Sequence, residues 1–593
     1  MDEHGKIVAD AKTQALVRQI RAVCLDPADS VVTLCGEARP GDLITYRRPD
    51  KTAAECSMTA LQAVPMYHKI AVRDIAAGEP VYKYGERIGL ALIDIKAGQH
   101  VHEHNLASPE IPFTENLPVT DGAAERWPEG VSFAGGPEED CTDNLLSAGG
   151  PSAGGRTDKC RAGESLIPMD SGDDHIYAYN SDLNDEAHGL RTGVDTFMGY
   201  RRPDGRVGIR NYVAIMAGTL CAAPAAEQIY DRMSREFSIP GQQPMDETRL
   251  IYLYNPNGCA QTPDDTGRTL DILSGLIANG NIYGALIVGL GCEGLQEEDY
   301  RRAVLEKAKK PLFYMKIQDE GLEKTVQHGC EIIRGLMAEA AGARRTPCPV
   351  SDLIIGLECG GSDPTSGFAA NPVLGIVSDQ VVDQGGSAVL SETPEAIGAE
   401  HILRRRGATP EIGQQIFDAV RANEWMFREL GLDVRSGNPS PGNKASGITT
   451  LEEKSMGCIH KSGSRPFEAV YGYGQQITHK GLAFMDTTAY DVASTVAKIA
   501  GGCQTVLFTT GMGTPVGCAA APVIKITGNP RTAAVMADMI DFSAADVTEG
   551  LQSVPELGEA LYALLLRVCS GARVKAEENG ACSISINQMH SMC

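Results

Sequence analysis

The residues best suited to chemistry lie in the segment 356–372, GLECGGSDPTSGFAANP, which follows a short apolar run typical of a buried strand. The thiol of Cys359 stands at the end of this run, followed by Ser362 and Asp363. The amide of Asn371 comes further along. Paired glycines let backbone N–H groups approach a ligand closely. The segment therefore predicts a small-ligand site at a strand end of an α/β enzyme, with a tight turn around a structural cysteine as the alternative.

A second candidate site is the histidine-rich segment 100–105, which reads HVHEHN. If this segment is extended, alternation places His100, His102 and His104 on one face. Imidazoles two residues apart on a strand can bind one cation. We therefore expect a metal site here, with a solvated strand end as the alternative.

Two more apolar runs end in turns that combine cysteine with glycine. The run 250–254 leads to Cys259, and the run 285–288 leads to Cys292. Together with Cys359 they place a thiol on the loops after three strands. Such thiols can ligate a metal ion or hold an iron–sulfur cluster, and simple packing of the turns is the alternative.

The elements that must position these residues alternate between strand and helix. This order predicts parallel sheet, with the loops gathered at the carboxyl ends of the strands. A strand at 388–390 leads into Glu392, and a strand at 506–508 leads into a glycine loop. We expect a helix after Thr450, with Glu453 three residues on to complete a capping box. The proline-rich NPSPGNK before it is expected to be non-helical.

The chain of 593 residues is too long for one ordinary domain. An opening helix is expected first, and from residue 68 short strands cut by glycine predict a small β domain. A later stretch rich in Pro, Gly, Ser, Asp and Glu predicts an acidic, flexible linker. The expected fold class is α/β, with a small N-terminal β domain, this linker, and a large body with mainly parallel sheets in two sub-domains. The expected boundaries are 1–106, 107–195, 196–430 and 431–593.

Composition restricts the partners. The formal net charge is −24, whereas nucleic acid binding needs a basic surface. No apolar stretch reaches the length of a membrane span, and the start MDEHGKIVADAK lacks the apolar core of a secretory signal. The 17 cysteines are scattered singly, without the pattern of a disulfide scaffold. We expect a cytoplasmic homo-oligomer that binds a small molecule, and neither nucleic acid nor membrane.

Several long motifs resemble one known family. They are CGGSDPTSGFAANP, GYRRPDGRVGIRNY (199–212), NPSPGNKASGITTLEEKSMG (438–457), FTTGMGTPVG (508–517) and the N-terminal HKIAVRDIAAGEPVYKYGERIGLALIDIKAGQHVHEHNL (68–106). In this order, and over most of its length, the chain resembles the altronate/galactarate dehydratases, sugar-acid hydro-lyases with a small SAF-type β domain. The resemblance implies dehydration of a sugar acid to a 2-keto-3-deoxy acid. The family also includes relatives that eliminate sulfite from sulfolactate.

Such a dehydration removes the proton α to a carboxylate and expels the β-hydroxyl. The site therefore needs a charge-stabilising cation, a carboxylate clamp and an acid–base pair. The resemblance favours His102 and His104 as ligands of one divalent metal, expected to be Fe²⁺, with further ligands from the body. An iron–sulfur cluster held by Cys259, Cys292 and Cys359 is the alternative.

Candidates for the other roles lie in or beside the matched motifs. Those expected to act in catalysis, with acid and base unassigned, are Asp363, Glu392, Lys444 and Lys454. Those expected to bind the substrate are Arg210, Ser362, Asn371, Thr509, Thr510, Thr514 and Lys525. Arginine and lysine suit a carboxylate, and hydroxyl side chains suit a polyol. For Glu400 the expected role is a salt bridge on a helix surface.

Three functions remain open at this point. The first is a metal-dependent hydro-lyase that acts on altronate, galactarate or a similar acid. The second is a C–S lyase that releases sulfite from sulfolactate by the same α-proton chemistry, with several Arg or Lys donors for the sulfonate. The third is a non-catalytic protein that binds an acid or a carbohydrate, which would not need so many polar glycine loops at strand ends.

Overall fold

The computed structural model describes residues 18–49, 55–108, 194–237 and 248–589. The chain divides into two compact units. Every described residue belongs to the unit formed by Met1–Pro109 and His175–Cys593. The other unit, Glu110–Asp174, lies outside the described residues. Nearly all of the expected linker and the first 17 residues, where an opening helix is expected, also lie outside them.

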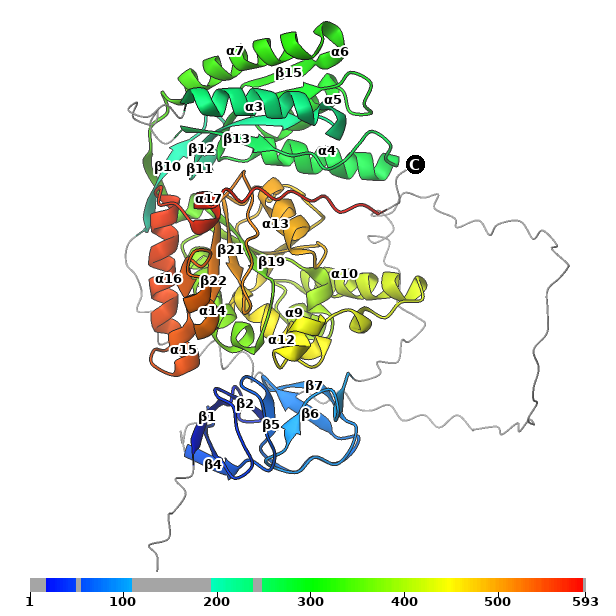
Figure 1. Ribbon diagram of the computed structural model, residues 1–593, viewed down its shortest axis with the longest axis vertical. Coiled ribbons are helices and arrows are strands. Elements are labelled where there is room, and N and C mark those ends of the chain that lie inside the picture. The colour runs from blue at the N-terminus through cyan, green and yellow to red at the C-terminus, as the bar shows by residue number, and fades with distance from the viewer. Residues whose placement is uncertain (1–17, 50–54, 109–193, 238–247, 590–593) are drawn as a thin grey trace, which may run out of the picture. The chain divides into compact units, whose positions relative to one another are not determined.

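The N-terminal part is a small β domain, drawn in blue in Figure 1. One sheet has the strand order β4-β3-β1-β2-β5-β8, and a second has the order β6-β7-β9. The strands are β1 (Gln19–Val23), β2 (Val31–Leu34), β3 (Leu43–Arg47), β4 (Glu55–Thr59), β5 (Lys69–Ala71), β6 (Pro80–Lys83), β7 (Glu86–Ala91), β8 (His100–Val101) and β9 (Leu106–Ala107). Glycine and other turn residues end each short run, as the sequence predicts.

The histidine-rich segment of this domain does not meet the condition for strand alternation. β8 ends at Val101, so the histidine-rich segment is not one extended strand. The carbonyl oxygen of His102 accepts hydrogen bonds from the backbone N–H groups of Asn105 and Leu106, and the N–H of His102 donates to the side chain of Asn105. The chain therefore turns at His102, and turn geometry rather than strand alternation sets the directions of the histidines.

The body begins with a four-stranded parallel sheet of order β13-β12-β14-β15. Its elements are β12 (Asn211–Ala217), α3 (Ala223–Phe237), β13 (Thr248–Leu253), α4 (Pro263–Ala278), β14 (Ile282–Gly289), α5 (Glu297–Lys307), β15 (Leu312–Lys316) and α7 (Leu322–Ala340). On β12, Val213 and Ile215 pack with α3 and α7, whereas Ala214 and Met216 join the core that contains α4 and α5. Figure 1 accordingly shows α3 and α7 on one side of β12 and β13, with α4 on the other.

The rest of the body is built on a seven-stranded sheet of order β19-β20-β18-β17-β21-β22-β23, in which all neighbours are parallel. Its strands are β17 (Ile354–Cys359), β18 (Ser387–Leu390), β19 (Phe467–Tyr471), β20 (Gly481–Met485), β21 (Thr505–Thr509), β22 (Val523–Thr527) and β23 (Phe542–Ser543). After β17 the chain adds strands on one side, and through β21 it returns to the other side of β17. β17 and β21 therefore flank a switch point, and open α/β sheets bind ligands at the carboxyl ends of such strands.

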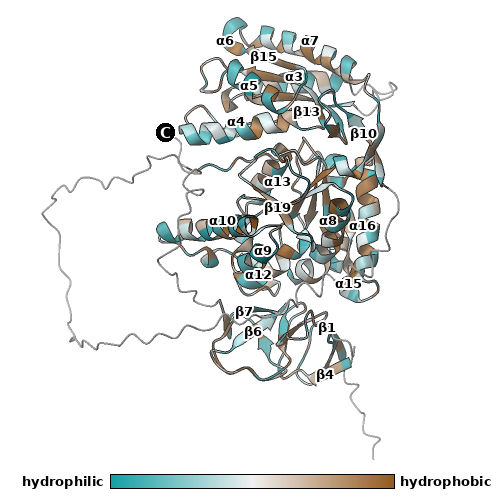
Figure 2. Ribbon diagram, turned by 180° about the vertical axis from the view of Figure 1, so that it is seen from behind, coloured by the Kyte–Doolittle hydropathy of each residue, from teal (hydrophilic) through white to brown (hydrophobic). Residues whose placement is uncertain are grey.

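Helices complete this part of the body. α8 (Asn371–Asp383) packs against α16 (Val554–Cys569), and α13 (Asp491–Ala500) packs against β17 and α4. Figure 2 shows α16 largely in the brown of apolar residues, and its Leu561 belongs to a core shared with α8 and with both parallel sheets. The other elements are β10 (Thr196–Arg201), β11 (Val207–Gly208), α6 (Ile317–Glu320), β16 (Thr346–Pro349), α9 (Glu400–Arg405), α10 (Pro410–Glu429), α11 (Pro441–Ala445), α12 (Leu451–Ile459), α14 (Pro530–Val535), α15 (Ala545–Glu549) and α17 (Lys575–Glu578).

The NPSPGNK segment contains a helix, contrary to expectation. Pro441 is the first residue of α11, where its missing N–H costs nothing, and the side chain of Ser440 caps the helix. α12 follows as expected, with the side chain of Thr450 accepting a hydrogen bond from the N–H of Glu453. The reciprocal half of the expected capping box is absent, because the Glu453 carboxylate accepts from the N–H of Thr449 instead.

A small β domain followed by a large body with two parallel sheets confirms the α/β fold class predicted from the sequence. Among the helices of the described ranges, none has the length and apolar character needed to cross a membrane.

Candidate active site

A small cleft opens at the carboxyl end of β17. Its walls come from the loop after β17, from α8 and α12, and from the turn that follows β6 of the β domain. Five residues predicted from the sequence line it: Cys359, Ser362, Asp363, Asn371 and Lys454. Three residues that the sequence did not single out as site residues line it as well: Tyr84, Glu453 and Cys458.

Cys359 is the last residue of β17 and is buried. Its Sγ lies 3.1 Å from the Oγ of Ser362, and the amide of Asn371 donates to it at 3.7 Å. The hydroxyl of Thr509, on β21, donates to Oδ1 of Asn371 at 2.6 Å and so orients that amide. The thiol of Cys458 lowers the pKa of Cys359 to about 7 by donating to it. The strand therefore ends in a thiol surrounded by donors that stabilise its ionised form.

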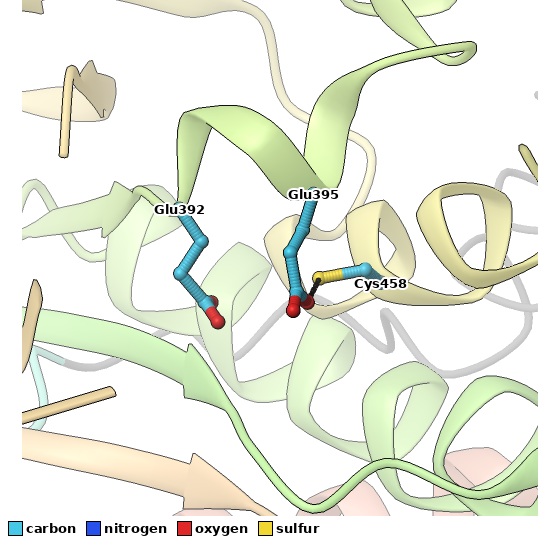
Figure 3. A group of neighbouring side chains, drawn as sticks. All are labelled: Glu392, Glu395 and Cys458. Carbon is cyan, nitrogen blue, oxygen red and sulfur yellow. Dashed lines mark hydrogen bonds between the residues drawn. The ribbon is translucent and has the colours of Figure 1, made fainter. Parts of the chain in front are cut away.

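A buried charged group lies beside this thiol pair. Figure 3 shows Glu392 and Glu395 descending from the turn after β18, with Cys458 reaching from α12 toward Glu395. The Nζ of Lys461 lies 2.6 Å from Oε2 of Glu392 and 2.7 Å from Sγ of Cys458. The Nζ of Lys454 lies 2.5 Å from Oε1 of Glu395. Although burial opposes the charge on Lys461, Cys458 and Glu392 raise its pKa well above the usual range.

Two more carboxyl groups extend this charged group. Glu358, on β17, pairs with the buried Lys498 of α13, and Asp491 begins α13. Burial raises the pKa of Glu358, and burial together with Glu358 raises that of Glu392. Burial and the charge of Glu392 raise the pKa of Asp491 to about 8. Burial and the neighbouring carboxyl groups thus disfavour the ionised form of these acids.

Backbone strain gathers around the cleft. In the described part of the chain, the non-glycine residues with positive φ are Tyr67, Tyr84 and Glu392, at 66°, 64° and 68°. Such a conformation costs a residue with a Cβ about 1–3 kcal/mol. Tyr84 lines the cleft, Glu392 belongs to the charged group, and the carbonyl of Tyr67 packs against Gly447 of the body. Strain of this kind concentrates at functional sites, where the surrounding structure maintains it.

Tyr84 makes the β domain part of the cleft wall. Its hydroxyl lies in a notch between Gly367, just before α8, and Gly457, on α12. A Cβ on Gly367 would collide with this hydroxyl, and a Cβ on Gly457 would come within 3.1 Å of it. Glycine at both positions therefore makes room for a tyrosine from another domain.

A buried ion group fixes the β domain to the body. Oε2 of Glu453 accepts a hydrogen bond from Lys69 at 2.8 Å, and Oε1 accepts one from Lys83 at 2.9 Å. Lys69 also donates to the carbonyl of Gly447 and to the hydroxyl of Thr449. Burial opposes the charge on Glu453, but the two lysines lower its pKa to about 2. Removal of one partner from such a group leaves an uncompensated buried charge, so the three residues act together.

This ion group predicts weaker attachment of the β domain in acid. The pKa of Glu453 is about 2, below its ordinary 4.5, so its contribution to stability is complete above pH 4.5 and is lost as the pH falls through 2. Complete protonation of Glu453 should lower the free energy of unfolding by about 3 kcal/mol. Burial lowers the pKa of Lys69 to about 8, so this lysine gives no acid loss of its own. The protection factors of the β5 amides, which are exchange rates corrected for the intrinsic effect of pH, should fall between pH 4.5 and 3 in the wild type but stay constant in Glu453→Gln, and equal acid dependence in both would contradict the assignment.

The histidines form a cluster near this ion group. Nδ1 of His68 lies 2.9 Å from Nε2 of His100, and Nδ1 of His102 lies 2.9 Å from the hydroxyl of Thr449. The rings of His102 and His104 approach that of His100, with centroids 5.5 and 5.2 Å apart. Burial lowers the pKa of His100 to about 3 and that of His102 to about 4. The two are therefore neutral near pH 7, but hydrogen bonds within the cluster already engage several ring nitrogens.

Groups able to hold a metal lie elsewhere in the described structure. Two sets of three side chains have donor atoms within 4.8 Å of one another: Glu392, Glu395 and Cys458, and Glu358, Glu392 and Asp491. Neither set contains His102, His104, Cys259, Cys292 or Cys359, whereas both contain Glu392. Oε1 of Glu358 and Oε1 of Glu392 are buried and accept no hydrogen bond from an N–H or hydroxyl group of the described residues, and the two carboxyl groups lie close enough to share a proton. Carboxylate oxygens in this condition fit a divalent cation.

The three cysteines expected on strand loops lie in different surroundings. Cys259 and Cys292 are exposed and follow β13 and β14 of the four-stranded sheet, whereas Cys359 is buried at the end of β17 in the seven-stranded sheet. This arrangement gives no support to an iron–sulfur cluster shared by all three.

Two expected cationic residues have other partners. The five N–H groups of Arg210 donate to the carboxylate of Glu577 and to the carbonyl oxygens of Ile209, Val568 and Ala572. Lys444 forms an ion pair at 2.7 Å with Glu103 of the β domain. The geometry favours a structural role for Arg210 and a domain contact for Lys444.

The remaining expected residues lie outside the cleft lining. Thr510 and Thr514 accept hydrogen bonds from backbone N–H groups of their own glycine loop. Lys525 is on β22, and burial lowers its pKa to about 8. Glu400 lies 3.6 Å from Arg421, but both residues are buried, so the pair is not on a helix surface.

Sequence reasoning found Lys454 but missed the two other residues on the same face of α12 and the turn that continues it, Cys458 and Lys461. Lys454, Cys458 and Lys461 are spaced i, i+4 and i+7, which places them on one side of a helix that continues into the next turn. That spacing was the available signal. No such signal marks Glu358 or Lys498, because each lies inside an apolar run whose pattern predicts burial alone.

Three family models match the chain. The altronate/galactarate dehydratase SAF domain matches residues 20–109, and the second domain of D-galactarate dehydratase/altronate hydrolase matches residues 199–341. The C-terminal domain of D-galactarate/altronate dehydratase matches residues 350–592. The matches thus include the β domain and both parallel sheets.

Curated relatives agree with these matches. The altronate dehydratase of Bacillus subtilis is 32% identical over 86% of this chain and 89% of its own length, and that of Escherichia coli is 32% identical over 88% and 91%. The (2R)-sulfolactate sulfo-lyase subunit beta of Chromohalobacter salexigens is 31% identical over 65% of this chain and 95% of its own length. The chain belongs to the altronate/galactarate dehydratase family of hydro-lyases.

Proposed function

We propose that this enzyme dehydrates an aldonate or aldarate, such as altronate or galactarate, to a 2-keto-3-deoxy acid in the cleft at the end of β17. The observation that carries the proposal is the gathering of Cys359, Tyr84 and Lys454 around one small cleft at the switch point. Elimination needs a base at C2, a proton donor at the C3 oxygen and positive charge near the carboxylate. These three side chains supply one group for each need.

Cys359 is placed to take the C2 proton, since Asn371 and Cys458 both donate toward its sulfur. The proton moves from C2 to Sγ, and the electron pair of the C–H bond forms the C2–C3 double bond as the C3–O bond breaks. The hydroxyl of Tyr84 gives its proton to the leaving oxygen, and water departs. The resulting enol takes up a proton at C3 and loses the proton of its C2 hydroxyl, which gives the 2-keto-3-deoxy acid, and proton exchange with water restores the Cys359 thiolate and the Tyr84 hydroxyl.

Lys454 is placed to hold the substrate carboxylate, because it lines the cleft as a cation paired with Glu395. Metal dependence is part of the proposal: a divalent cation, when bound, stabilises the negative charge that develops next to the substrate carboxylate. The carboxyl groups Glu358, Glu392 and Asp491 are the residues that would hold it.

Release of sulfite from sulfolactate is the second candidate, because a sulfo-lyase subunit is among the relatives. A sulfonate is held best by several cationic donors. Lys454 is the single lysine in the described lining of the cleft, which contains no arginine. The cleft therefore favours a hydroxyl as the leaving group.

A substrate panel tests the proposed function. The purified protein, supplied with Fe²⁺, Mn²⁺ or Mg²⁺, should form a 2-keto acid from altronate, galactarate or a related sugar acid, without sulfite from sulfolactate. Chelation should lower the rate by at least about 100-fold, and added metal should restore it. Sulfite release without any keto acid from sugar acids would favour the second candidate, and full activity after complete metal removal would contradict the metal dependence.

Tyr84→Phe should lower kcat by about 100-fold without changing thermal stability, since it removes a proton donor but no packing. Gly367→Ala should impair both activity and stability, because its Cβ collides with the Tyr84 hydroxyl. The double variant Tyr84→Phe/Gly367→Ala should regain stability but not activity. The control is Tyr82→Phe on β6, the strand before Tyr84, which should leave kcat unchanged. A Tyr84→Phe variant with wild-type kcat would remove Tyr84 from the mechanism.

A further inference from the structure

Three exposed cysteines lie at one edge of the four-stranded sheet. The strand order places β12 between β13 and β14, and all three strands are parallel. Cys221 follows β12, Cys259 follows β13 and Cys292 follows β14, each before the next helix begins. Three adjacent strands therefore each place a thiol on the loop at their carboxyl end. The chain changes direction between β12 and β14, and open α/β sheets bind ligands at such a point.

Hydrogen bonds hold these three loops together. The N–H of Gly218, just after β12, donates to the carbonyl of Val288 near the end of β14 at 2.8 Å. The carbonyl of Gly218 accepts from the side-chain amide of Asn255, in the loop after β13, at 2.9 Å. The N–H of Leu220 donates to the carbonyl of Asn257 at 2.9 Å. The loop after β12 is thus fixed to the other two within a few residues of each thiol.

The exposure of these cysteines is unusual. A free cysteine behaves as a small apolar residue and is among the most often buried residue types. Among the described cysteines four are exposed, and three of the four are those at this edge; the other is Cys582. Packing of the turns, the alternative for such thiols, would bury them. Several accessible thiols at one sheet edge are instead typical ligands of a soft metal centre.

A buried hydroxyl in the same loop provides a second, independent observation. Thr219 stands two residues before Cys221 and is 3% exposed. Its Oγ1 is buried and has no hydrogen-bond partner in the described ranges. A buried hydroxyl without a partner costs free energy, so this atom indicates a bound group that accepts its hydrogen bond. The sulfur atoms of an iron–sulfur cluster accept such bonds.

We infer that Cys221, Cys259 and Cys292 hold a [4Fe–4S] cluster, so that Cys221 takes the place predicted for Cys359. The described donor sets that converge within 4.8 Å, as one metal ion requires, include none of these three thiols. A cluster is several ångströms wide, so its ligands lie farther apart than those of one ion. The carboxylate of Glu293 already accepts from two backbone N–H groups of its own turn, and the segment between β15 and α7 contains no cysteine. The fourth iron is thus left to bind water or an oxygen of a hydroxy acid.

The test measures cluster binding without substrate, so it does not rest on the proposed function. Full-length protein, purified without oxygen, is reconstituted with equal parts of Fe²⁺ and Fe³⁺ and with sulfide. These form the cluster core without a further oxidant, and the three thiols lose their protons to the buffer. About four iron and four sulfide per chain are expected, with a Mössbauer spectrum in which one iron differs from the other three. Cys221→Ser, Cys259→Ser and Cys292→Ser should each lower the iron and sulfide content by at least about tenfold.

Cys582→Ser is the matched control, since it removes the exposed thiol that lies away from this edge, and it should keep the full iron and sulfide content. All four variants should melt as cooperatively as the wild type, because the replaced side chains are exposed. Loss of the cluster in Cys359→Ala but not in Cys221→Ser would place it at β17. Binding of one Zn²⁺ per chain in a parallel titration, with no cluster formed, would make this a site for a single ion. Either result, or a wild type that takes up no iron and sulfide, would overturn the inference.

Discussion

Replacement of Cys359 by alanine is expected to lower kcat by about 10³-fold, with little change in KM or in thermal stability. The reason is that the sulfur is the group placed to take the C2 proton, while the neighbours that shape the cleft remain in place. Asn371 still bonds to the carbonyl of Gly457, and Asn443 still bonds to the carbonyl of Ser362. Initial rates of keto-acid formation across a range of substrate concentrations measure the effect.

Cys503→Ala is the matched control for this substitution. Cys503 is also a fully buried thiol, but it lies just before β21 and so at the opposite end of the strands of the seven-stranded sheet. Burial raises its pKa to about 12, so it stays protonated. This variant should keep its kcat. Retention of more than about a tenth of kcat in Cys359→Ala would exclude the thiol as the base.

Glu453→Gln is expected to have the largest effect on stability. It leaves Lys69 and Lys83 buried without their common counter-charge, which typically costs about 3–5 kcal/mol. Because the loss falls on the contact between the β domain and the body, Tyr84 should leave the cleft and activity should disappear with it. Denaturant unfolding and amide hydrogen exchange at β5 and α12 measure the two parts of this prediction.

Glu577→Gln serves as the comparison, since it breaks the buried ion pair with Arg210 inside the body. It should destabilise the protein, yet leave hydrogen exchange at β5 and the activity at low temperature unchanged. If Glu453→Gln kept wild-type exchange at β5 and wild-type kcat, the ion group would not fix the β domain and the cleft would not depend on Tyr84.

The parts of the fold that follow from local patterns were predictable. Apolar runs that alternate with helical segments predicted the parallel sheets. Cys359, Ser362 and Asn371 were predictable as site residues because their thiol, hydroxyl and amide come from one short segment. The helix at Pro441 was missed because proline was treated only as a helix breaker, although it favours the first helical turn.

The rest of the site depends on contacts between distant residues. Glu453 meets Lys83 and Lys69 across 370 and 384 positions, and Glu358 meets Lys498 across 140. Charges inside apolar runs predict burial but not the identity of the partner. The notch for Tyr84 requires two glycines from separate elements, and neither glycine has local evidence of that use.

The most direct test of the central claim is a crystal structure of Cys359→Ala with a sugar acid that the wild type converts. The account predicts the acid in the cleft at the end of β17, with its C2 facing residue 359, its C3 hydroxyl near Tyr84 and its carboxylate near Lys454. An acid bound instead beside the histidines His68, His100 and His102, or at the loops that carry Cys259 and Cys292, would contradict the account.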